Sequence, residues 1–288
     1  MPNRIGLRTV KSAEVREAIR CACRFDVIAM KPGNVSIDSP GHGMTAHDFL
    51  LSAAAVAPLL VQTDKTVGEC VFDATRASIA VANCNTNLGI ILLAGPFASA
   101  ATLESGECDL RRRVARVLEQ LSVADSKWIF SAIRHAIPAG LGRVAEQDLH
   151  TEPTLALKEV MRLSARHDRI AYQYANDYED IFEFGLPLLR EYCGRWESLV
   201  SASVGVYLGM LSRYLDSHVV RKHGTQRAQE IRAVARTLES DFKACENPAT
   251  LTDRLTRFDR ELKEIGVNPG TSADLTVATV LAMLLQHL

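Results

Sequence analysis

Residues 12–34 read SAEVREAIRCACRFDVIAMKPGN, and the helical signal of the chain is strongest in this stretch. Its apolar positions Val15, Ile19 and Ala22 recur with a period of about 3.6, which is typical of an α-helix with one buried face. Pro32 and Gly33 then stop that helix, because proline lacks an amide hydrogen and glycine favours turns. The sequence therefore predicts a helix over Ser12–Ala29 that ends in a Pro-Gly turn.

The same period continues through most of the chain. Further helices are predicted from Thr45 to about Leu60 and over Val71–Asn83, Leu88–Ser99, Leu110–Ser122, Ser126–Ala136, Thr154–Arg166, Tyr178–Arg190, Glu197–Leu215, Gln226–Phe242, Thr250–Ile265 and Ser272–His287. Only Leu88–Leu93 could equally be a buried strand, and Ile137–Pro153 is predicted to be a long connection. Hairpin signals, strand-helix alternation and glycine-rich phosphate loops are absent from the sequence. We predict an all-α, multi-helix globular domain that spans residues 1–288.

Composition and charge narrow the functional class. With 47% hydrophobic residues, 23% charged residues and a net charge of −1, the chain is typical of soluble proteins and lacks the basic excess of non-specific nucleic-acid binders. The seven cysteines are irregularly spaced without a Cys-x-x-Cys motif, which disfavours zinc sites and disulfides. Neither a signal peptide nor an apolar run that could span a bilayer is evident. We expect a cytoplasmic protein without membrane or nucleic-acid partners, and a homo-oligomer is one option.

Two Pro-Gly turns are the best functional signal. One lies in Lys31-Pro32-Gly33-Asn34-Val35-Ser36 and the other in Asn268-Pro269-Gly270-Thr271-Ser272-Ala273-Asp274-Leu275. Each leads toward a helix that starts with a hydroxyl residue followed three positions later by an aspartate, namely Asp48 and Asp274. Backbone N–H groups and a carboxylate at a helix start suit a phosphate with a divalent metal. The alternative is a capping box in each case, formed with Thr45 or Thr271.

The first turn opens a polar loop that ends at Asp48. A functional interpretation makes Lys31 a cation for phosphate, while Gly33 permits close approach by a ligand. The polar side chains of the loop that would join them are Asn34, Ser36, His42 and His47. His47 or Asp48 would act on a proton or a metal ion. A solvated loop with a helix cap at Asp48 is equally consistent with the sequence.

Three further polar segments could contribute. Asn85 and Thr86 precede an apolar helix, where they would shape a pocket or simply cap the helix. The charges and tyrosines of Arg166–Asp180 could contact an anionic substrate or form an exposed helix face. Asp216, His218, Arg221 and Lys222 precede Gly224, as at a helix C-terminus. The same residues could bind polyphosphate, with Asp216 holding magnesium.

The order of these segments resembles one family. A Lys-Pro-Gly loop, an Asn-Thr-x-x-Gly turn, an Asp-x-His-x-x-Arg-Lys-x-Gly stretch and a terminal Pro-Gly-x-Ser-Ala-Asp-Leu recur in the triphosphoribosyl-dephospho-coenzyme A synthases, over about Cys21–Leu285. This resemblance implies a helical, Mg²⁺-dependent transferase in which the 2′-hydroxyl of dephospho-coenzyme A attacks C1′ of ATP and adenine leaves. It implies phosphate contacts from Lys31 and Arg221 and a metal or hydroxyl role for Asp48, Asp216 and Asp274.

The candidate site that follows has three parts. The catalytic candidates are Asp48, His47 and Asp274, and the metal candidates are Asp48, Asp216 and Asp274. Substrate and phosphate binding are assigned to Lys31, Gly33, Asn34, Ser36, Asn85, Thr86, His218, Arg221, Lys222, Gly270 and Ser272. Small phosphorylated molecules are the expected partners.

Two departures from the family pattern leave alternatives open. The family turn Asn-Thr-His-Lys-Gly is replaced by Asn85-Thr86-Asn87-Leu88-Gly89, and its Gly-Ala-His-x-Asp-Met loop is altered between Gly41 and Asp48. One alternative is a divergent enzyme for another cofactor, such as a one-carbon carrier of the methanofuran or methanopterin type. The other alternative is an inactive nucleotide-binding scaffold that kept the fold.

Overall fold

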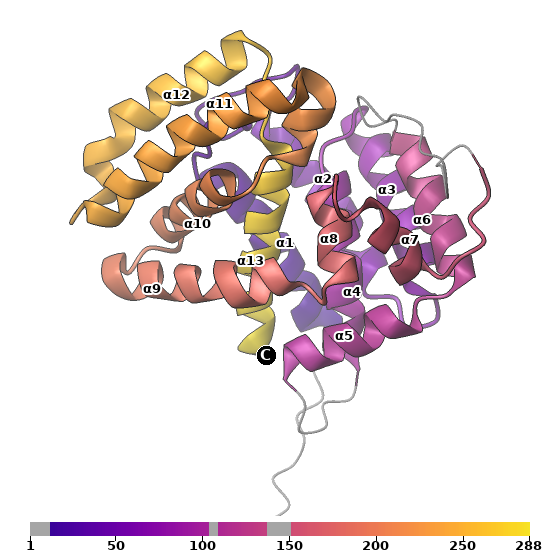
Figure 1. The fold of residues 1–288 in the computed structure, drawn as a ribbon. Helices are drawn as coiled ribbons and strands as arrows, with labels where there is room; N and C mark the ends of the chain where they lie inside the picture. The colour runs from indigo at the N-terminus through magenta and orange to yellow at the C-terminus, as the bar shows by residue number, and fades with distance from the viewer. Residues whose placement is uncertain (1–11, 104–108, 137–150) are drawn as a thin grey trace, which may run out of the picture.

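The computed structural model describes residues 12–103, 109–136 and 151–288, and these ranges are helical almost throughout (Figure 1). The α-helices are α1 (Ser12–Ile28), α2 (Ala46–Leu60), α3 (Val67–Ala82), α4 (Leu88–Thr102), α5 (Leu110–Gln120), α6 (Val123–Ala136), α7 (Leu157–Ser164), α8 (Arg169–Ala175), α9 (Leu186–Trp196), α10 (Leu199–Arg213), α11 (Ser217–Ala244), α12 (Thr252–Glu264) and α13 (Gly270–Gln286). A π-helix, η1 (Asp180–Gly185), and a 3-10 helix, η2 (Pro248–Leu251), complete them. In the described ranges, β-pairing is limited to two isolated bridges in the loop before α2. The predicted all-α fold is confirmed.

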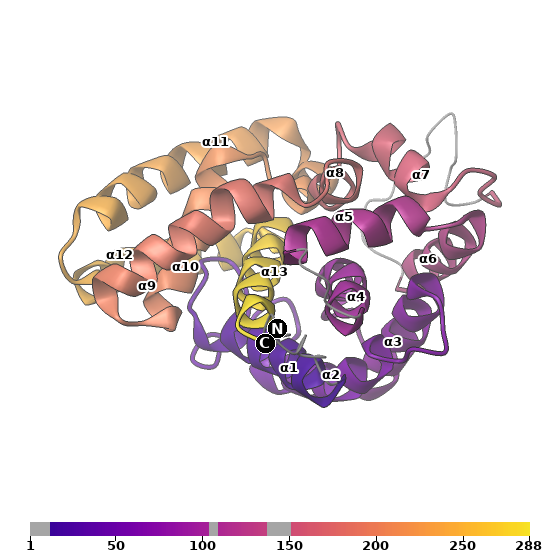
Figure 2. The ribbon, with the colours of Figure 1, turned by 90° about the horizontal axis from the view of Figure 1, so that it is seen from below.

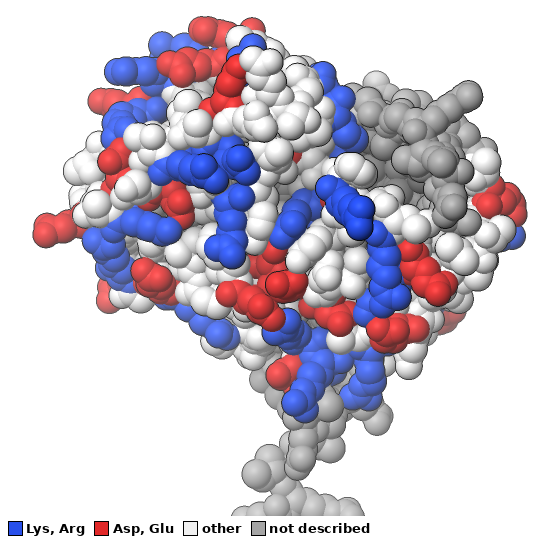
Figure 3. Space-filling model, in the orientation of Figure 1, with Lys and Arg blue, Asp and Glu red and all other residues white. Residues whose placement is uncertain are grey.

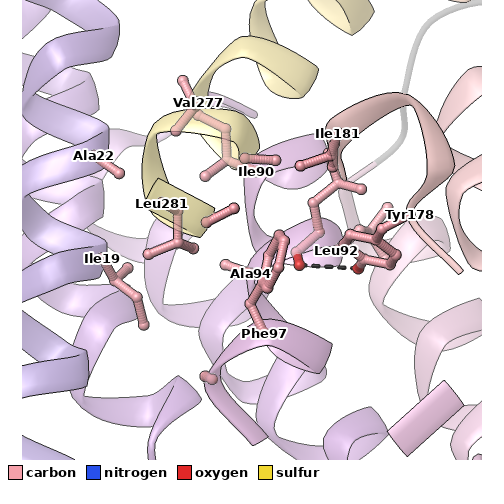
Figure 4. Packing of buried hydrophobic residues seen from close by; sticks show 14 of the residues in the cluster. Ile19, Ala22, Ile90, Leu92, Ala94, Phe97, Tyr178, Ile181, Val277 and Leu281 are labelled. Atoms are coloured by element: carbon pink, nitrogen blue, oxygen red, sulfur yellow. Dashed lines mark hydrogen bonds between the residues drawn. The ribbon is translucent and has the colours of Figure 1, made fainter. Parts of the chain in front are cut away.

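The last helix, α13, occupies the centre of the molecule. It packs against α1, α4, α10 and η1. Figure 2 shows α1, α4 and α10 around it. Figure 4 shows Val277 and Leu281 of α13 facing Ile19 and Ala22 of α1 and Ile90 of α4. An apolar C-terminal segment thus becomes the axis around which earlier helices assemble.

Helix α4 is buried nearly all round, which explains its ambiguous sequence. Residues 90–98 are all buried, so no amphipathic period marks them, and the strand alternative for Leu88–Leu93 is wrong. Pro96 lies inside the helix and leaves the carbonyl of Leu92 without its usual amide donor. The buried hydroxyl of Tyr174 donates to that carbonyl at 2.6 Å. Tyr178 donates to the carbonyl of Leu93 at 2.9 Å, and this bond is dashed in Figure 4.

A second apolar cluster joins α10, α11 and α12. Leu208 and Leu211 of α10 pack there with Ile231, Leu238 and Phe258. Ala273, near the start of α13, belongs to this cluster, whereas the rest of α13 belongs to the larger one. One helix thus contributes to both clusters of the described residues, and the single domain predicted over residues 1–288 stays a prediction.

Several predicted boundaries need correction. Helix α3 begins at Val67, ahead of the predicted Val71, because Thr66 and Glu69 form a capping box there. The predicted helix Tyr178–Arg190 is instead the π-helix η1 followed by α9. The helix predicted over Thr154–Arg166 is the shorter α7, and α8 follows outside that predicted range. Most of the predicted connection Ile137–Pro153 lies outside the described residues. Within the described chain, no helix combines the length and the apolar character needed to cross a membrane.

The corrected boundary that matters most for function is the start of α11. Residues 217–223 were predicted to end a helix, but they begin one, since Asp216 caps it by accepting the amide of Val219 at 3.0 Å. Gly224, with φ of 84°, then kinks the helix instead of ending it. The basic residues at 221 and 222 therefore lie near a helix N-terminus.

Candidate active site

The two Pro-Gly turns lie against each other. Gly33 has φ of 85°, and a Cβ there would come within 2.7 Å of Pro269 Cδ and 3.1 Å of the carbonyl of Val267. Glycine is required on both counts. The amide of Gly33 donates to Asp259 Oδ1 at 2.7 Å, which fastens the first turn to α12. His42 completes the turn, with its Nε2 2.9 Å from the carbonyl of Gly33.

Lys31 lies inside this junction and already has a carboxylate partner. Its side chain is 1% exposed, and its Nζ is 2.9 Å from Asp26 Oδ1 of α1. The ammonium also donates to the carbonyls of Asp26 and Ala29. A buried lysine requires such compensation. The sequence reasoning missed Asp26, although an aspartate on the apolar face of a predicted helix is a signal that could have identified it.

Asp274 of α13 is the exceptional group of the site. Its carboxylate is partly buried and has neither a hydrogen bond nor an ion pair in the described part of the chain. It faces the first turn of α4 so closely that a Cβ on Gly89 would lie 2.0 Å from Oδ2. Burial, followed by the neighbouring carboxylates of Asp26 and Asp216, raises the pKa of Asp274 well above its usual value, while Arg221 acts in the opposite direction. Such an unpartnered carboxylate is costly to the fold, which points to a role toward a ligand.

Asp216 connects the first turns of α11 and α13. Its Oδ2 accepts the amide of Ser272 at 2.7 Å and the hydroxyl of Ser272 at 2.8 Å. Thr271 contributes the reciprocal contact, because its Oγ1 accepts the amide of His218 at 3.2 Å. The alternative of a capping box between Thr271 and Asp274 is therefore wrong: α13 begins at Gly270, and Asp216 at the start of α11 supplies the acceptor.

His218 and Arg221 place nitrogen atoms beside these carboxylates. Burial lowers the pKa of His218, and Arg221, Lys222 and His42 act in the same direction against the influence of Asp216. The imidazole is therefore biased toward its neutral form. Arg221 binds Asp168 Oδ2 through Nη1 at 2.6 Å, whereas its buried Nε lacks a partner in the described residues. Lys222 is exposed.

The groups around Asp274, namely Asp26, Asp216, His218 and Arg221, form with it a polar cluster. Some of the remaining candidates lie beside this cluster and others lie farther away. Gly270 is adjacent, since a Cβ there would lie 3.5 Å from His218 Nδ1. Asn85 and Thr86 stand at the start of α4, where Asn85 Oδ1 accepts the amide of Leu88 at 3.4 Å. Thr86 bonds to the hydroxyl of Ser78. Asn34 donates to Tyr207, and the buried hydroxyl of Ser36 has no partner in the described ranges.

Asp48 forms its hydrogen bonds with Thr45, and no hydrogen bond or ion pair among the described residues joins Asp48 or His47 to the polar cluster. Asp48 Oδ2 accepts the amide of Thr45 at 2.7 Å and its hydroxyl at 2.8 Å, so the alternative of a capping box is confirmed. These bonds lower the pKa of Asp48, and His47 is exposed. Among the described residues, no group of three or more His, Cys, Asp or Glu could hold a metal ion. The predicted trio Asp48, Asp216 and Asp274 is therefore not assembled as a cage.

The two departures near Gly89 have structural partners. Asn87 is buried and donates to the carbonyl of Phe49 at 3.3 Å and to Ser52 Oγ at 2.8 Å, which fixes α4 to α2. Leu88 packs against the larger apolar cluster. Both side chains stabilise the start of α4, which carries Gly89 to Asp274.

Similarity to known proteins indicates the family of the chain. The sequence profile of the ATP:dephospho-CoA triphosphoribosyl transferases matches residues 12–288. The chain belongs to this family. It is accordingly a transferase with a role in making a coenzyme A derivative. Among curated proteins, none matches the chain.

A solved structure agrees with that membership. The crystal structure of a candidate triphosphoribosyl-dephospho-coA synthase from Archaeoglobus fulgidus superposes with a TM-score of 0.64 at 26% sequence identity. The match covers 81% of this chain and 97% of the other. The resemblance predicted from the order of motifs is thus confirmed.

Proposed function

We propose that this member of the family transfers the triphosphoribosyl group of ATP to the 2′-hydroxyl of dephospho-coenzyme A, with Asp274 as the proton acceptor. The observation that carries the role of Asp274 is its partly buried carboxylate without partners, placed where the first turns of α4, α11 and α13 meet. A raised pKa makes this carboxylate a stronger base than an exposed aspartate.

The reaction breaks one bond and forms one at the same carbon atom. The bond from C1′ to adenine breaks, the bond from C1′ to the acceptor oxygen forms, and Asp274 takes the hydroxyl proton. Adenine leaves with the bonding electron pair and gains a proton from its surroundings. The sugar carbon becomes electron-poor in between, and the carboxylates of Asp26 and Asp216 would stabilise that positive charge.

The surrounding groups suit the phosphates of the donor. Arg221 retains nitrogen donors beyond its bond to Asp168, and Lys222 is exposed next to it. Both lie in the first turns of α11, where backbone dipoles also favour an anion. His218, biased toward neutrality, can donate or accept a hydrogen bond without repelling the cationic sugar.

Magnesium fits this proposal as a companion of the nucleotide. Both oxygens of Asp216 already accept hydrogen bonds, which leaves Asp274 as the carboxylate with free oxygen atoms. Mg²⁺ commonly binds through one or two carboxylates together with substrate phosphates and water. Because Asp274 is proposed as the proton acceptor, the ion would be held chiefly by the phosphates of the nucleotide and by water, and would neutralise the phosphate charge there.

Adenine release tests the proposal. Purified protein is incubated with ATP, dephospho-coenzyme A and Mg²⁺, and free adenine is separated by chromatography. We expect adenine only when both substrates are present, and a loss of about 10²- to 10⁴-fold in rate for Asp274→Asn. Undiminished adenine release by that variant would refute the role of Asp274, and the absence of adenine from the unmodified protein would refute the reaction.

A further inference from the structure

An open cleft lies between α7 and α8, outside the Asp274 cluster. It has a volume of about 460 Å³, within the range of small-molecule sites. Its lining is rich in arginine and includes one aromatic ring, and consists of Arg162, Ala165, Arg166, Arg169, Tyr172, Ala175 and Asn176. Figure 3 shows Lys and Arg side chains gathered over α7 and α8 on this face.

Two of these arginines form no ion pair among the described residues. Arg162 and Arg166 are exposed and four positions apart, and neither forms an ion pair in the part of the chain that the structure describes. Arg162 belongs to α7 and Arg166 to the turn after it, and the two like charges on one cleft lining repel each other. The repulsion is relieved when an anion lies between them.

The carboxylates near the cleft are already engaged. Glu119, which lies close enough to Arg162 to interact with it, binds Lys158 at 2.5 Å, and Asp177 binds the same ammonium at 2.6 Å. Glu179 accepts the hydroxyl of Tyr172 at 2.7 Å. The cleft therefore keeps a positive field that these groups do not fully neutralise.

The third arginine of the lining, Arg169, is held in a fixed position. The guanidinium of Arg169 lies 3.7 Å from the ring centroid of Tyr172 and 3.8 Å from that of Tyr214. It also binds both oxygens of buried Asp180, at 2.6 and 2.7 Å. An arginine held by stacking and by a two-pronged ion pair retains its position, so the cleft is already formed before a ligand arrives.

A short chain of contacts joins the cleft to the candidate active site. The amide of Arg169 donates to Ser217 Oγ at 2.8 Å, at the first residue of α11. The adjacent Asp168 binds Arg221, whose charge acts on Asp274. A molecule with its reacting end near Asp274 could thus extend its charged end toward α7.

We propose that Arg162 and Arg166 bind the phosphate chain of a small phosphorylated substrate in this cleft. The ligand class is a linear chain of two or three phosphates, which presents several oxygen atoms to paired guanidinium groups. Assigning the chain to ATP or to dephospho-coenzyme A rests on the proposed function, whereas the binding of phosphates does not.

Calorimetric titration with inorganic tripolyphosphate, ATP and dephospho-coenzyme A tests this site. We expect the double variant Arg162→Gln/Arg166→Gln to bind tripolyphosphate about a hundredfold more weakly, and each single variant about tenfold more weakly. The matched control is Arg257→Gln/Arg260→Gln on α12, which removes the same charge from exposed arginines without ion pairs in the described residues. Equal affinity of the double variant and the unmodified protein, or equal weakening by the control, would overturn the proposal.

The titrations with ATP and with dephospho-coenzyme A identify which of the two places its phosphates in the cleft. A loss confined to ATP assigns the triphosphate to the cleft, and a loss confined to dephospho-coenzyme A assigns its diphosphate. Asp274→Asn should leave tripolyphosphate binding within about twofold while adenine release falls, because the cleft is a separate set of side chains. Failure of the proposed reaction would appear as absent adenine with the arginine effect intact. Failure of the cleft would appear as adenine release with no arginine effect on any of the three ligands.

Discussion

The segments Thr45–Asp48 and Thr271–Asp274 share a sequence pattern but differ in structure. In the first, Asp48 turns back to the amide and hydroxyl of Thr45 and lies at the surface. In the second, Asp274 makes no such bond and lies beside Gly89 in a cluster of carboxylates. The pattern alone therefore does not distinguish a helix cap from a functional carboxylate.

A neighbouring helix makes the difference. At α13 the exposed N–H of Ser272 is bound by Asp216 from the start of α11, so Asp274 is not needed as a cap. At α2, Asp48 and Thr45 form the cap locally. A helix start that is satisfied from outside can release its own carboxylate for chemistry.

The largest expected contrast is in activity. Asp274→Asn should reduce adenine release by about 10²- to 10⁴-fold, because it removes the proton acceptor and preserves the size of the side chain. Asp48→Asn should change the rate by less than about threefold, since it alters only a surface cap. Steady-state rates of both variants under identical conditions measure the contrast. Comparable losses in the two variants would show that the two aspartates do not differ in their contribution to the reaction.

The next largest effect on activity is expected where α4 closely approaches Asp274. Gly89→Ala would place a methyl group 2.0 Å from the present position of Asp274 Oδ2 and so displace the carboxylate. We expect roughly a tenfold to hundredfold loss of adenine release, as for other small misplacements of reacting groups. Gly194→Ala on α9 is the control, because no atom lies within 4 Å of its added Cβ. An unimpaired Gly89→Ala enzyme would show that Asp274 need not remain where it lies.

The pH dependence of the unfolding free energy tests whether Asp274 lies in a buried, acidic environment. The pKa of Asp274 is raised above its ordinary value near 3.8, so the folded protein binds a proton that the unfolded chain has lost. The unfolding free energy should therefore fall as pH rises above about 4, until the folded-state pKa is passed. Asp274→Asn should remove this fall and gain stability relative to the unmodified protein at higher pH. Chemical unfolding of both proteins across that pH range measures it, and parallel curves would contradict the raised pKa.

The smallest effect concerns the surface cap. Asp48→Ala removes two hydrogen bonds at the start of α2 and should lower Tm slightly. Because these bonds lower the pKa of Asp48, its stabilisation is present at neutral pH and is lost as pH falls through that lowered pKa. Thermal unfolding at neutral and acidic pH measures both features. A Tm difference that persisted at low pH would point to packing instead of the cap.

Local patterns predicted the helices well because each carries an apolar period, as in α1 and α12, or is bounded by turns, as in α4. They failed where distant residues decide the local structure. The carbonyls of α4 that accept from Tyr174 and Tyr178, and the bond from Ser272 to Asp216, join residues far apart in the sequence. The cap of α11 by Asp216 and the pair of Lys31 with Asp26 are local contacts that the periodicity alone did not reveal. The motif order included Asp274, Asp216 and Asp48 alike among the candidates, and it could not separate Asp48, whose different environment appears only in three dimensions.

Gly224 in α11 divides that helix into two units of different purpose. Its left-handed φ of 84° is required by the backbone alone, because no atom lies within 4 Å of where a Cβ would stand. The short unit before it carries Asp216, His218 and Arg221, and the long unit after it packs in the second apolar cluster. The bend therefore separates the polar side chains at the candidate site from the apolar side chains that anchor the long unit, so a change of a polar side chain in the short unit should leave the packing of the long unit in place.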